Sequence, residues 1–367
     1  MRAWAVTTAG EPLEQVSRPD PVPTGAEVVV EVTHCGVCHS DLHTWDGYYD
    51  LGGGQRLSLA ERGVTLPLVL GHEMAGRVAA VGPDVEGVAV GDLRIVYPWI
   101  GCGRCAVCLR GEDHMCEAMR SLGIYQDGGY STHVTVPHER YLVDPGSVDL
   151  SVAATFACSG ITVVSAISKL APLDARDPVV LFGAGGLGLA AIAVLRATGH
   201  ETIVTVDLSA DNRDAALRAG ATAVVDGGAD DVPAAVVEAC GATVGSIIDF
   251  VNSGSTARAA HASLRKGGTL VQVGLFGGDL TVALPVMATR ATTIRGSFVG
   301  SLTDLRALVD LADSGRFTPA PVEVVPLDDA NLALERLRSG RVTGRLVLSA
   351  DAGASAASST ILEKGLA

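Results

Sequence analysis

The sequence predicts an α/β protein built from a doubly wound parallel sheet and a smaller, mainly β part. Two observations predict the sheet. Apolar runs alternate with helical patterns from about residue 160 to residue 297, and a glycine-rich turn over 183–188 separates the first run from an Ala/Leu-rich segment. Before residue 150, short strand patterns punctuated by glycine predict a small β-barrel. A chain of 367 residues has room for both parts.

Polar residues follow the strand patterns in the first part of the chain. A strand over 26–33 runs into a segment rich in His, Cys, Ser and Asp at 34–50. A second strand pattern over 66–73 also ends in polar residues. Residues 51–63 contain three consecutive glycines and no period, which predicts a surface loop. A cysteine-rich loop occupies 101–117.

An Ala-rich helix is expected over 152–170, and the α/β alternation follows it. The alternating strands and helices are expected, in order, at 178–182, 189–195, 202–206, 211–219, 223–226, 232–239, 246–251, 255–264 and 269–274. After about residue 297 the pattern changes to helices over 303–314 and 328–339 and a strand over 345–349. These last elements are expected to return to the first domain, which makes the parallel sheet an insertion in it. The predicted organisation is 1–159, 160–297, 298–350, and a flexible tail over 351–367.

The glycine-rich turn has the pattern G-x-G-x-x-G, which is typical of Rossmann dinucleotide-binding sites. Gly183 permits the tight turn, Gly185 lets a pyrophosphate approach the backbone, and Gly188 lets the helix pack close to the strand. The N-terminus of that helix offers free N–H groups to phosphates. An ordinary turn is the simpler interpretation of such a pattern alone, but here it stands between a strand and a helix.

Asp207 predicts which dinucleotide is bound. It ends the next apolar run, at about the 20-residue distance from the turn where a carboxylate bonds the adenosine ribose hydroxyls. A carboxylate there accepts bonds from a free 2′-hydroxyl and repels a 2′-phosphate. Leu208 and Ser209 follow it, and Arg213 is the nearest base. The sequence therefore favours NAD over NADP.

Charge and composition exclude several classes of function. The formal net charge of −14 argues against nucleic acid or an anionic membrane surface as a partner, because both require a basic face. No apolar run in the sequence approaches the ~18 residues of a membrane span. The first residues enter a strand pattern without the features of a signal peptide, so a cytoplasmic location is expected. The eight cysteines are clustered, which indicates metal binding rather than disulfides.

Four cysteines lie close together at Cys102, Cys105, Cys108 and Cys116. Four thiolates at this density suit tetrahedral zinc in a closed structural site. An iron–sulfur cluster remains the competing interpretation, because short-spaced ferredoxin runs also use C-x2-C-x2-C.

A second, dispersed set consists of Cys38, His72 and Cys158. Two thiolates and one imidazole leave the fourth tetrahedral position open, which is the Cys2His form of catalytic zinc sites. Asp41 is a candidate to orient the imidazole of His72. Taken singly, Cys158 in an Ala-rich helix is more simply a small buried hydrophobe. Cys35 is a spare thiol in this interpretation, as is Cys240.

Taken together, these stretches resemble the zinc-dependent alcohol dehydrogenases of the medium-chain dehydrogenase/reductase superfamily. The resemblance extends over residues 1 to about 350, in the family order. It implies a GroES-like catalytic domain with an inserted Rossmann domain, NAD, and two zinc ions per subunit. It also implies a homodimer or homotetramer. The departures are the insertion around 51–63 and the C-terminal tail; the first lies beside the expected substrate entrance.

The resemblance assigns roles residue by residue. Cys38, His72 and Cys158 match the catalytic zinc ligands. Ser40 and His43 match a relay that carries the substrate proton to solvent, and Glu73 matches a carboxylate that approaches the zinc during ligand exchange. The coenzyme-binding residues that it implies are His39, Thr162, Gly183, Gly185, Gly186, Leu187, Gly188, Asp207, Val273 and Arg345.

The leading hypothesis is therefore reversible hydride transfer between an alcohol and NAD, giving an aldehyde or ketone. The partner is a small molecule, and the chemistry requires zinc to acidify the bound alcohol. One alternative is a dehydrogenase of a polyol or of a cyclic or secondary alcohol. Another is a non-catalytic NAD-binding member of the superfamily. Trp45 and Trp99 are candidates for the pocket wall or for simple packing.

Overall fold

The structure, a computed structural model, describes residues 1–170 and 172–352. Its second half contains the predicted parallel sheet, in the strand order β13-β12-β11-β14-β15-β16. All of its pairings are parallel. The strands are β11 (Val179–Phe182), β12 (Ile203–Asp207), β13 (Ala223–Asp226), β14 (Val244–Asp249), β15 (Leu264–Gln272) and β16 (Thr293–Gly296). The chain starts in the middle of this sheet and winds outward on both sides, as the α/β alternation predicts.

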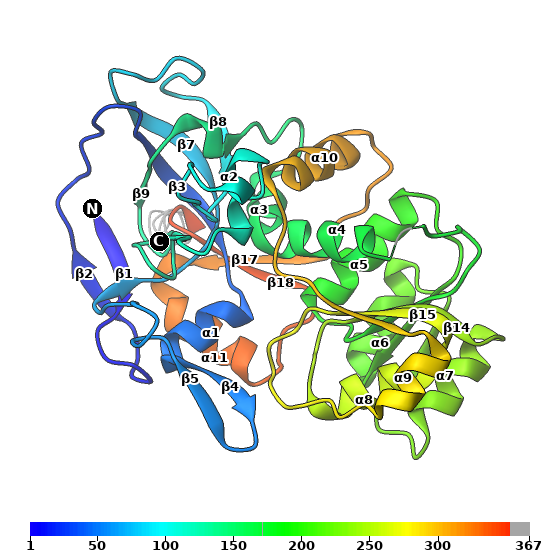
Figure 1. Cartoon of the computed structure of the whole chain (residues 1–367). Coiled ribbons are helices and arrows are strands. Elements are labelled where there is room, and N and C mark those ends of the chain that lie inside the picture. Colours follow the sequence, from blue (N-terminus) through cyan, green and yellow to red (C-terminus); the bar gives the residue numbers. More distant parts are fainter. Residues whose placement is uncertain (171, 353–367) are drawn as a thin grey trace, which may run out of the picture.

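Helices follow the strands of this sheet in the expected alternation (Figure 1). They are α5 (Gly186–Ala197), α6 (Ala210–Ala219), α7 (Val232–Cys240), α8 (Gly254–Ser263) and α9 (Leu284–Arg290). The predicted ends of α6, α7 and α8 agree with the observed ends or differ from them by one residue. Caps explain the N-termini, since Ser209, Asp231 and Ser253 each accept a hydrogen bond from the first turn of the helix that follows.

The first part of the chain forms antiparallel sheets that pack around a cluster of buried apolar side chains. Its strands are β1 (Arg2–Val6), β2 (Glu14–Ser17), β3 (Val28–Gly36), β6 (Leu68–Val69), β7 (Glu73–Val81), β8 (Leu93–Val96), β9 (His133–Val136) and β10 (Leu142–Val143). The strand β3 is central, because it pairs with both β7 and β9. The residues Val28, Val30 and Val32 alternate into a buried cluster on one face of β3.

The C-terminal strands join the sheet of the first part. They are β17 (Val322–Pro326) and β18 (Arg345–Ser349), and the helices of this segment of the chain are α10 (Leu302–Asp313) and α11 (Ala330–Arg338). The strand β18 pairs antiparallel with β3 and parallel with β17. Figure 1 shows these orange and red strands beside the blue β3, although the two segments are far apart in sequence. The predicted tail lies, from residue 353 onward, outside the described residues.

The expected helix over 152–170 is not one regular α-helix. It consists of α3 (Leu150–Thr155), a π-helical turn (Phe156–Gly160) and α4 (Ile161–Ser168). The indole Nε1 of Trp99 donates to the carbonyl of Ala157 at 2.9 Å, a contact that a chain-local pattern does not reveal. Such π turns are frequent at functional sites. The stretch Leu150–Ser168 has the length and apolar composition of a membrane span, contrary to the expectation from the sequence, but most of it is buried inside the protein.

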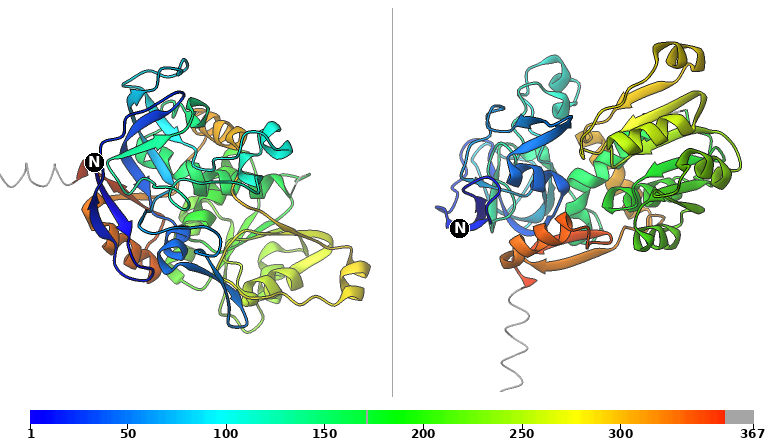
Figure 2. Two further views of the ribbon diagram at one scale, coloured as in Figure 1. Left: turned by 60° about the vertical axis from the view of Figure 1, so that its left-hand side comes forward. Right: turned by 90° about the horizontal axis from the view of Figure 1, so that it is seen from below.

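The segment predicted as a surface loop over 51–63 contains a β-hairpin. Its strands are β4 (Tyr48–Gly52) and β5 (Gln55–Ser58), which pair antiparallel. The turn between them uses Gly53 and Gly54 at positive φ, as glycine allows. The strands are too short and too exposed to show an alternating pattern. Figures 1 and 2 show the blue hairpin reaching toward the half of the molecule that holds the parallel sheet.

Candidate active site and coenzyme cleft

Three separate elements bring Cys38, His72 and Cys158 together. Cys38 precedes α1 (His39–Asp46), His72 stands between β6 and β7, and Cys158 lies in the π turn. One ligand atom from each lies within 4.8 Å of the others. His72 is fully buried and Cys158 is nearly so. The three residues that the sequence singled out therefore form one compact cluster.

The hydrogen bonds of His72 and Asp41 prepare the imidazole for a metal. The Nδ1 atom of His72 lies 3.0 Å from Oδ1 of Asp41, so Nδ1 carries the proton that the carboxylate accepts. Asp41 is itself held by the Tyr130 hydroxyl at 3.2 Å and by the backbone N–H of Gly71 at 3.3 Å. The Nε2 atom of His72 is buried and has no hydrogen-bond partner among the described residues. A buried lone pair beside two thiols fits a zinc ligand.

The two thiols of the cluster differ in acidity. The contact with Cys158 and the neighbouring His72 lower the pKa of Cys38 well below its usual range, although burial opposes this. The same contact and burial raise the pKa of Cys158 well above its usual range. Cys38 therefore loses its proton before Cys158. Two thiolates this close together repel each other, and a divalent cation between them would stabilise both.

A separate cluster holds the other four predicted ligands. Cys105 and Cys108, at the start and in the body of α2 (Ala106–Leu109), have their sulfurs 3.5 Å apart, and Cys116 lies 3.8 Å from Cys105. The backbone N–H of Cys102 points at the sulfur of Cys116 at 3.4 Å. All four sulfurs lie within 4.8 Å of one another. Backbone hydrogen bonds near Arg104 lower the pKa of Cys102 to about 6, which favours a thiolate.

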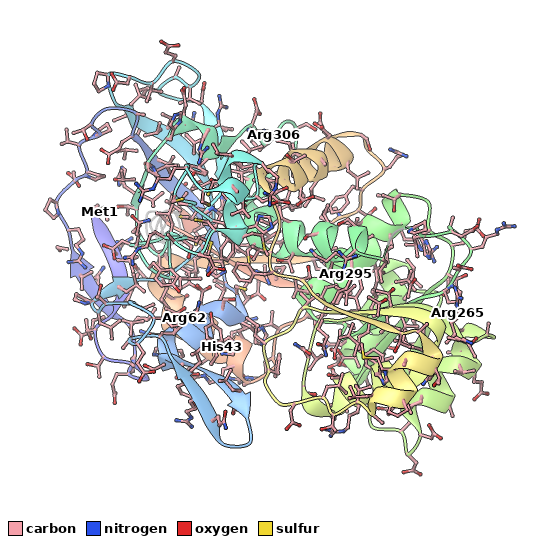
Figure 3. All side chains as sticks on the ribbon, viewed as in Figure 1. Met1, His43, Arg62, Arg265, Arg295 and Arg306 are labelled. Carbon is pink, nitrogen blue, oxygen red and sulfur yellow. The ribbon has the colours of Figure 1, made fainter. Side chains whose placement is uncertain are left out.

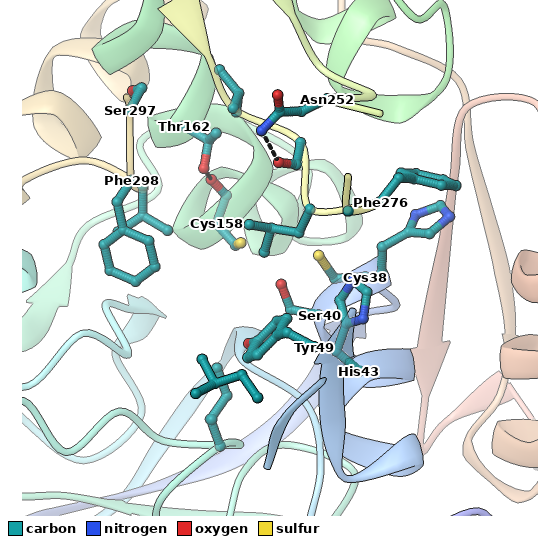
Figure 4. A pocket seen from close by; sticks show the side chains of 18 of the residues that line it. Cys38, Ser40, His43, Tyr49, Cys158, Thr162, Asn252, Phe276, Ser297 and Phe298 are labelled. Carbon is teal, nitrogen blue, oxygen red and sulfur yellow. Dashed lines mark hydrogen bonds between the residues drawn. The ribbon is translucent and has the colours of Figure 1, made fainter. Parts of the chain in front are cut away.

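A cavity of about 490 Å³ lies above the first cluster and between the two halves of the molecule. Figure 4 shows the sulfurs of Cys38 and Cys158 facing each other at its edge. Its wall includes residues from both halves, so a ligand there contacts both. The predicted site residues that line it are Cys38, His39, Ser40, His43, Cys158, Thr162, Leu187 and Val273.

Ser40 and His43 lie on α1 and both line this cavity. They make no direct hydrogen bond to each other in the described part of the chain. The ring of His43 packs against Tyr49, with centroids 4.9 Å apart. Burial lowers the pKa of His43, so the ring is neutral near pH 7 and able to accept a proton.

His39 and Thr162 occupy opposite walls of the cleft. His39 packs against the ring of Phe276, with centroids 5.3 Å apart, and burial lowers its pKa. The Thr162 hydroxyl donates to the carbonyl of Cys158 at 2.7 Å, which ties α4 to the π turn. Both residues line the cavity, and their roles as coenzyme contacts stay predictions.

Glu73 and Arg345 form a buried ion pair next to the metal-ligand cluster. The other carboxylate oxygen of Glu73 accepts the backbone N–H of Ser159 at 3.1 Å. Burial raises the pKa of Glu73, and the Arg345 charge counters that rise. A Cβ on Gly186 would come within 2.5 Å of the Arg345 side chain, so Arg345 lies against the start of α5. The family resemblance implied a coenzyme-binding role for Arg345, but nothing in the sequence indicated its pairing with Glu73.

The glycines of the turn have the geometry that the motif predicts. Gly183 has φ of +98°, a conformation that favours glycine. A Cβ on Gly188 would lie 2.0 Å from the carbonyl oxygen of Gly183, so helix and strand touch there. A Cβ on Gly185 would meet nothing within 4 Å among the described residues, which leaves its backbone open to a ligand.

Asp207 lies at the end of β12 and faces the same turn. Its carboxylate accepts the backbone N–H of Ala184 at 2.7 Å and of Ser209 at 2.8 Å. Arg213 donates to the carbonyl of Asp207 at 2.8 Å and pairs with Asp226 at 3.2 Å. Arg213, the basic residue nearest to Asp207 in the sequence, is therefore already bound by acceptors of the protein.

Several residues of the cavity wall are not indicated by the sequence: Tyr49, Arg62, Ser121, Asn252, Phe276 and Phe298. Asn252 is at φ of +56° and donates to the carbonyl of Gly274 at 2.9 Å (Figure 4). No local motif surrounds any of them, and only the fold brings them to one wall. Trp99 lines the cavity, whereas Trp45 packs under Arg338, 4.2 Å from its guanidinium carbon.

A buried Cys2His cluster beside a Rossmann-type cleft defines a dehydrogenase of the zinc-binding class. Comparison with known proteins matches residues 24–145 to the alcohol dehydrogenase GroES-like domain and residues 186–314 to the zinc-binding dehydrogenases. The chain belongs to the zinc-dependent alcohol dehydrogenase family of the medium-chain dehydrogenases/reductases.

Individual relatives agree with this. An NAD-dependent alcohol dehydrogenase of Sulfurisphaera tokodaii is 38% identical over 350 residues, covering 95% of this chain and 99% of that protein. A D-arabinose 1-dehydrogenase (NADP+) of Saccharolobus solfataricus is 33% identical over 343 residues, covering 92% and 94%. The crystal structure of an alcohol dehydrogenase from Aeropyrum pernix is similar with a TM-score of 0.86 at 31% identity, covering 95% of this chain and 100% of that one.

Proposed function

We propose that this protein is an NAD-dependent alcohol dehydrogenase that transfers hydride reversibly between an alcohol and NAD, giving an aldehyde or ketone. The observation that carries the proposal is the Cys38, His72 and Cys158 cluster, placed at the edge of a cavity that the coenzyme-binding half also lines. The relatives named NAD-dependent alcohol dehydrogenase support the same reaction.

In this proposal Cys38, His72 and Cys158 would hold a zinc ion, which would supply the Lewis acid that lowers the pKa of an alcohol in the cavity. Asp41 keeps the imidazole of His72 in one tautomer and orientation. Ser40 and His43, both facing the cavity, take the alcohol proton and pass it toward solvent.

The coenzyme-binding residues act by position. The open backbone at Gly185 and the N-terminus of α5 receive the pyrophosphate, with His39 and Arg345 beside it. Leu187, Thr162 and Val273 line the cavity where the nicotinamide would lie. The apolar wall around Trp99 and Phe298 limits access of water to the reacting atoms.

Asp207 supports NAD as the coenzyme. Its carboxylate lies beside the turn, where it accepts ribose hydroxyls and repels a 2′-phosphate. Arg213 is engaged by Asp226 and two carbonyls, which disfavours its use by a phosphate.

We also propose two zinc ions per subunit, the second held by Cys102, Cys105, Cys108 and Cys116. Their mutual proximity supports a closed tetrahedral site with a structural role. Metal analysis of the purified protein tests this: two equivalents of zinc are expected, whereas iron with visible absorption would favour the cluster interpretation.

The protein is proposed to act in the cytoplasm, on a small molecule, as a homodimer or homotetramer. The eight cysteines are free in the structure, which fits a reducing compartment. Exposed apolar side chains near the edge of the parallel sheet, such as Leu284 and Val286, support an interface between copies. Light scattering after size exclusion would give the subunit number.

The test of the reaction is the initial rate of NADH formation from NAD with primary, secondary, aromatic, cyclic and polyhydroxy alcohols. Turnover of simple alcohols supports the proposal, and a preference for polyols or cyclic alcohols supports the alternative dehydrogenase. A protein that binds zinc and NADH but turns over none of these substrates would be a non-catalytic member of the family.

A further inference from the structure

The solvent side of the substrate cavity has a cation that the proposed reaction does not use. Among the residues that line the cavity, all within the described chain, Arg62 is the single arginine and lysine is absent. Arg62 is exposed, whereas Cys158 and His72 are buried, so the cation lies toward solvent from the metal-ligand cluster. Figure 3 places Arg62 in the same part of the molecule as His43.

Arg62 is free to bind a ligand. Within residues 1–170 and 172–352 it has no ion pair and its guanidinium makes no hydrogen bond, although the protein carries a net charge of −14. Its charge also reaches Tyr49. Burial raises the pKa of Tyr49 to about 12, and Arg62 opposes that rise. The guanidinium therefore lies near a phenol that itself faces the cavity.

Ser121 is a second polar group on this wall. It is fully buried, it lines the cavity, and its hydroxyl has no partner in the described part of the protein. The side chain of the preceding residue, Arg120, reaches the loop that holds Arg62, because its Nη1 lies 3.9 Å from the position of a Cβ on Gly63. A buried hydroxyl without a protein partner is uncommon, so that of Ser121 is available to a ligand in the cavity.

Asp50 is the one carboxylate among the residues that line the cavity in the described chain, and it has a structural partner. Its Oδ1 accepts the backbone N–H of Gly52 at 2.7 Å, within the hairpin turn. The backbone of Asp50 also touches Gly277, where the hairpin meets the coenzyme-binding half. Asp50 is thus positioned by the hairpin, whereas Arg62 and Ser121 are left to meet a ligand.

We propose that Arg62, with Ser121, binds a carboxylate of the substrate, so that the preferred substrates are hydroxy acids and the corresponding oxo acids with the acid group remote from the reacting carbon. The fork of the guanidinium matches the two oxygens of a carboxylate, and a serine hydroxyl can donate to one of them. This inference rests on the proposed function, since it names the substrate class of the same cavity.

The test compares kcat/KM for 6-hydroxyhexanoate and its methyl ester, with NAD and the zinc-loaded enzyme. The wild type is expected to favour the acid, and Arg62→Gln is expected to lower the acid-to-ester ratio about fivefold, as for a partly solvated ion pair. Arg56→Gln is the matched control, because Arg56 stacks on Tyr48 and does not line the cavity. Ser121→Ala should lower the ratio in the same direction, and added salt should do so too.

This inference is overturned if the wild type uses the acid and the ester equally well, or if Arg62→Gln and Arg56→Gln change the acid-to-ester ratio equally. The proposed function still holds in either case, provided that the protein oxidises alcohols. If the protein oxidises no alcohol, the proposed function fails. The carboxylate site is then tested by ligand binding alone. Hexanoate should then bind the enzyme–NADH complex more tightly than hexanamide, and Arg62→Gln should remove the difference. NADH fluorescence measures both affinities, and equal affinities in the wild type would overturn the carboxylate site.

Discussion

At the scale of single residues, the Asp41–His72 pair determines whether the imidazole is ready for a metal. Asp41→Asn weakens the bond to Nδ1 and allows other tautomers and orientations of the ring. We expect zinc affinity to fall on the order of tenfold or more. Competition with a chelator measures the affinity.

Asp46→Asn is the control for this change. Asp46 lies on the same helix and pairs with Arg338 at 2.6 Å near the surface. An equal loss of zinc affinity in both variants would show that Asp41 acts through the stability of α1 and not through the imidazole.

Asp207 is the second residue whose effect can be isolated. Asp207→Gly removes the carboxylate that faces the ribose site and the repulsion of a 2′-phosphate. The ratio of kcat/KM for NAD over NADP should fall by a factor on the order of ten, the size of one hydrogen bond to a charged group. Glu201→Gln, which changes an exposed carboxylate before the opposite end of β12, should leave the ratio near that of the wild type. An unchanged ratio in Asp207→Gly would remove the ribose assignment.

At the scale of elements, the hairpin of β4 and β5 closes one side of the cavity by touching the coenzyme-binding half. A Cβ on Gly52 would lie 2.6 Å from the Cα of Gly278. Gly52→Ala must therefore push the hairpin away from that loop and widen the cavity. We expect the KM values for NAD and alcohol to rise several-fold.

Gly54→Ala separates this effect from backbone strain. Gly54 has φ of +78°, close to the +82° of Gly52, but a Cβ there would meet nothing within 4 Å among the described residues. Both variants should lose about 1 kcal/mol of stability from the left-handed conformation. Steady-state kinetics give the KM values of both variants. An equal rise in Gly52→Ala and Gly54→Ala would show that the contact with Gly278 does not affect KM.

The π turn explains why one element was harder to predict than the others. Helix patterns in the sequence locate α6, α7 and α8 within a residue, because their caps and apolar faces are local. The turn Phe156–Gly160 instead has a hydrogen-bond partner, Trp99, that is distant in sequence. The hairpin of β4 and β5 was missed for a related reason, since its contact partners are in the other half of the chain.

At the scale of the whole molecule, the buried pair of Glu73 and Arg345 ties the last strand to the metal-ligand cluster. Glu73→Gln leaves the Arg345 charge buried without its partner, which should lower the free energy of unfolding by about 3 kcal/mol. Denaturant unfolding measures the change. Glu323→Gln breaks a surface pair with Arg336 and should cost less than about 1 kcal/mol. Equal losses would mean that burial of the Arg345 charge is not the cause.

The sequence predicted the parallel sheet, its glycine-rich turn and the four-cysteine cluster, because each has a local signal or a fixed spacing. Gly183 and Gly188, for example, are required by a turn that two neighbouring elements define. The dispersed set of Cys38, His72 and Cys158 has no fixed spacing, and it was indicated by its ligand chemistry and by the resemblance to a family. The walls of the substrate cavity could not be predicted, since Arg62 and Ser121 have no motif and come together only in the folded chain. The pairing of Glu73 with Arg345 is of the same kind.

The position of β18 also has a consequence for synthesis of the protein. It is an interior strand of the first sheet, between β3 and β17, yet it is made only after residue 344. It carries the arginine that completes the pair with Glu73 beside the metal ligands and that lies against the coenzyme turn. During translation the N-terminal half therefore lacks an inner strand. Until that strand is made, Glu73 lacks its partner and the coenzyme turn lacks the side chain of Arg345. A chain that ends before this strand therefore lacks both the strand that joins β3 to β17 and the arginine that pairs with Glu73.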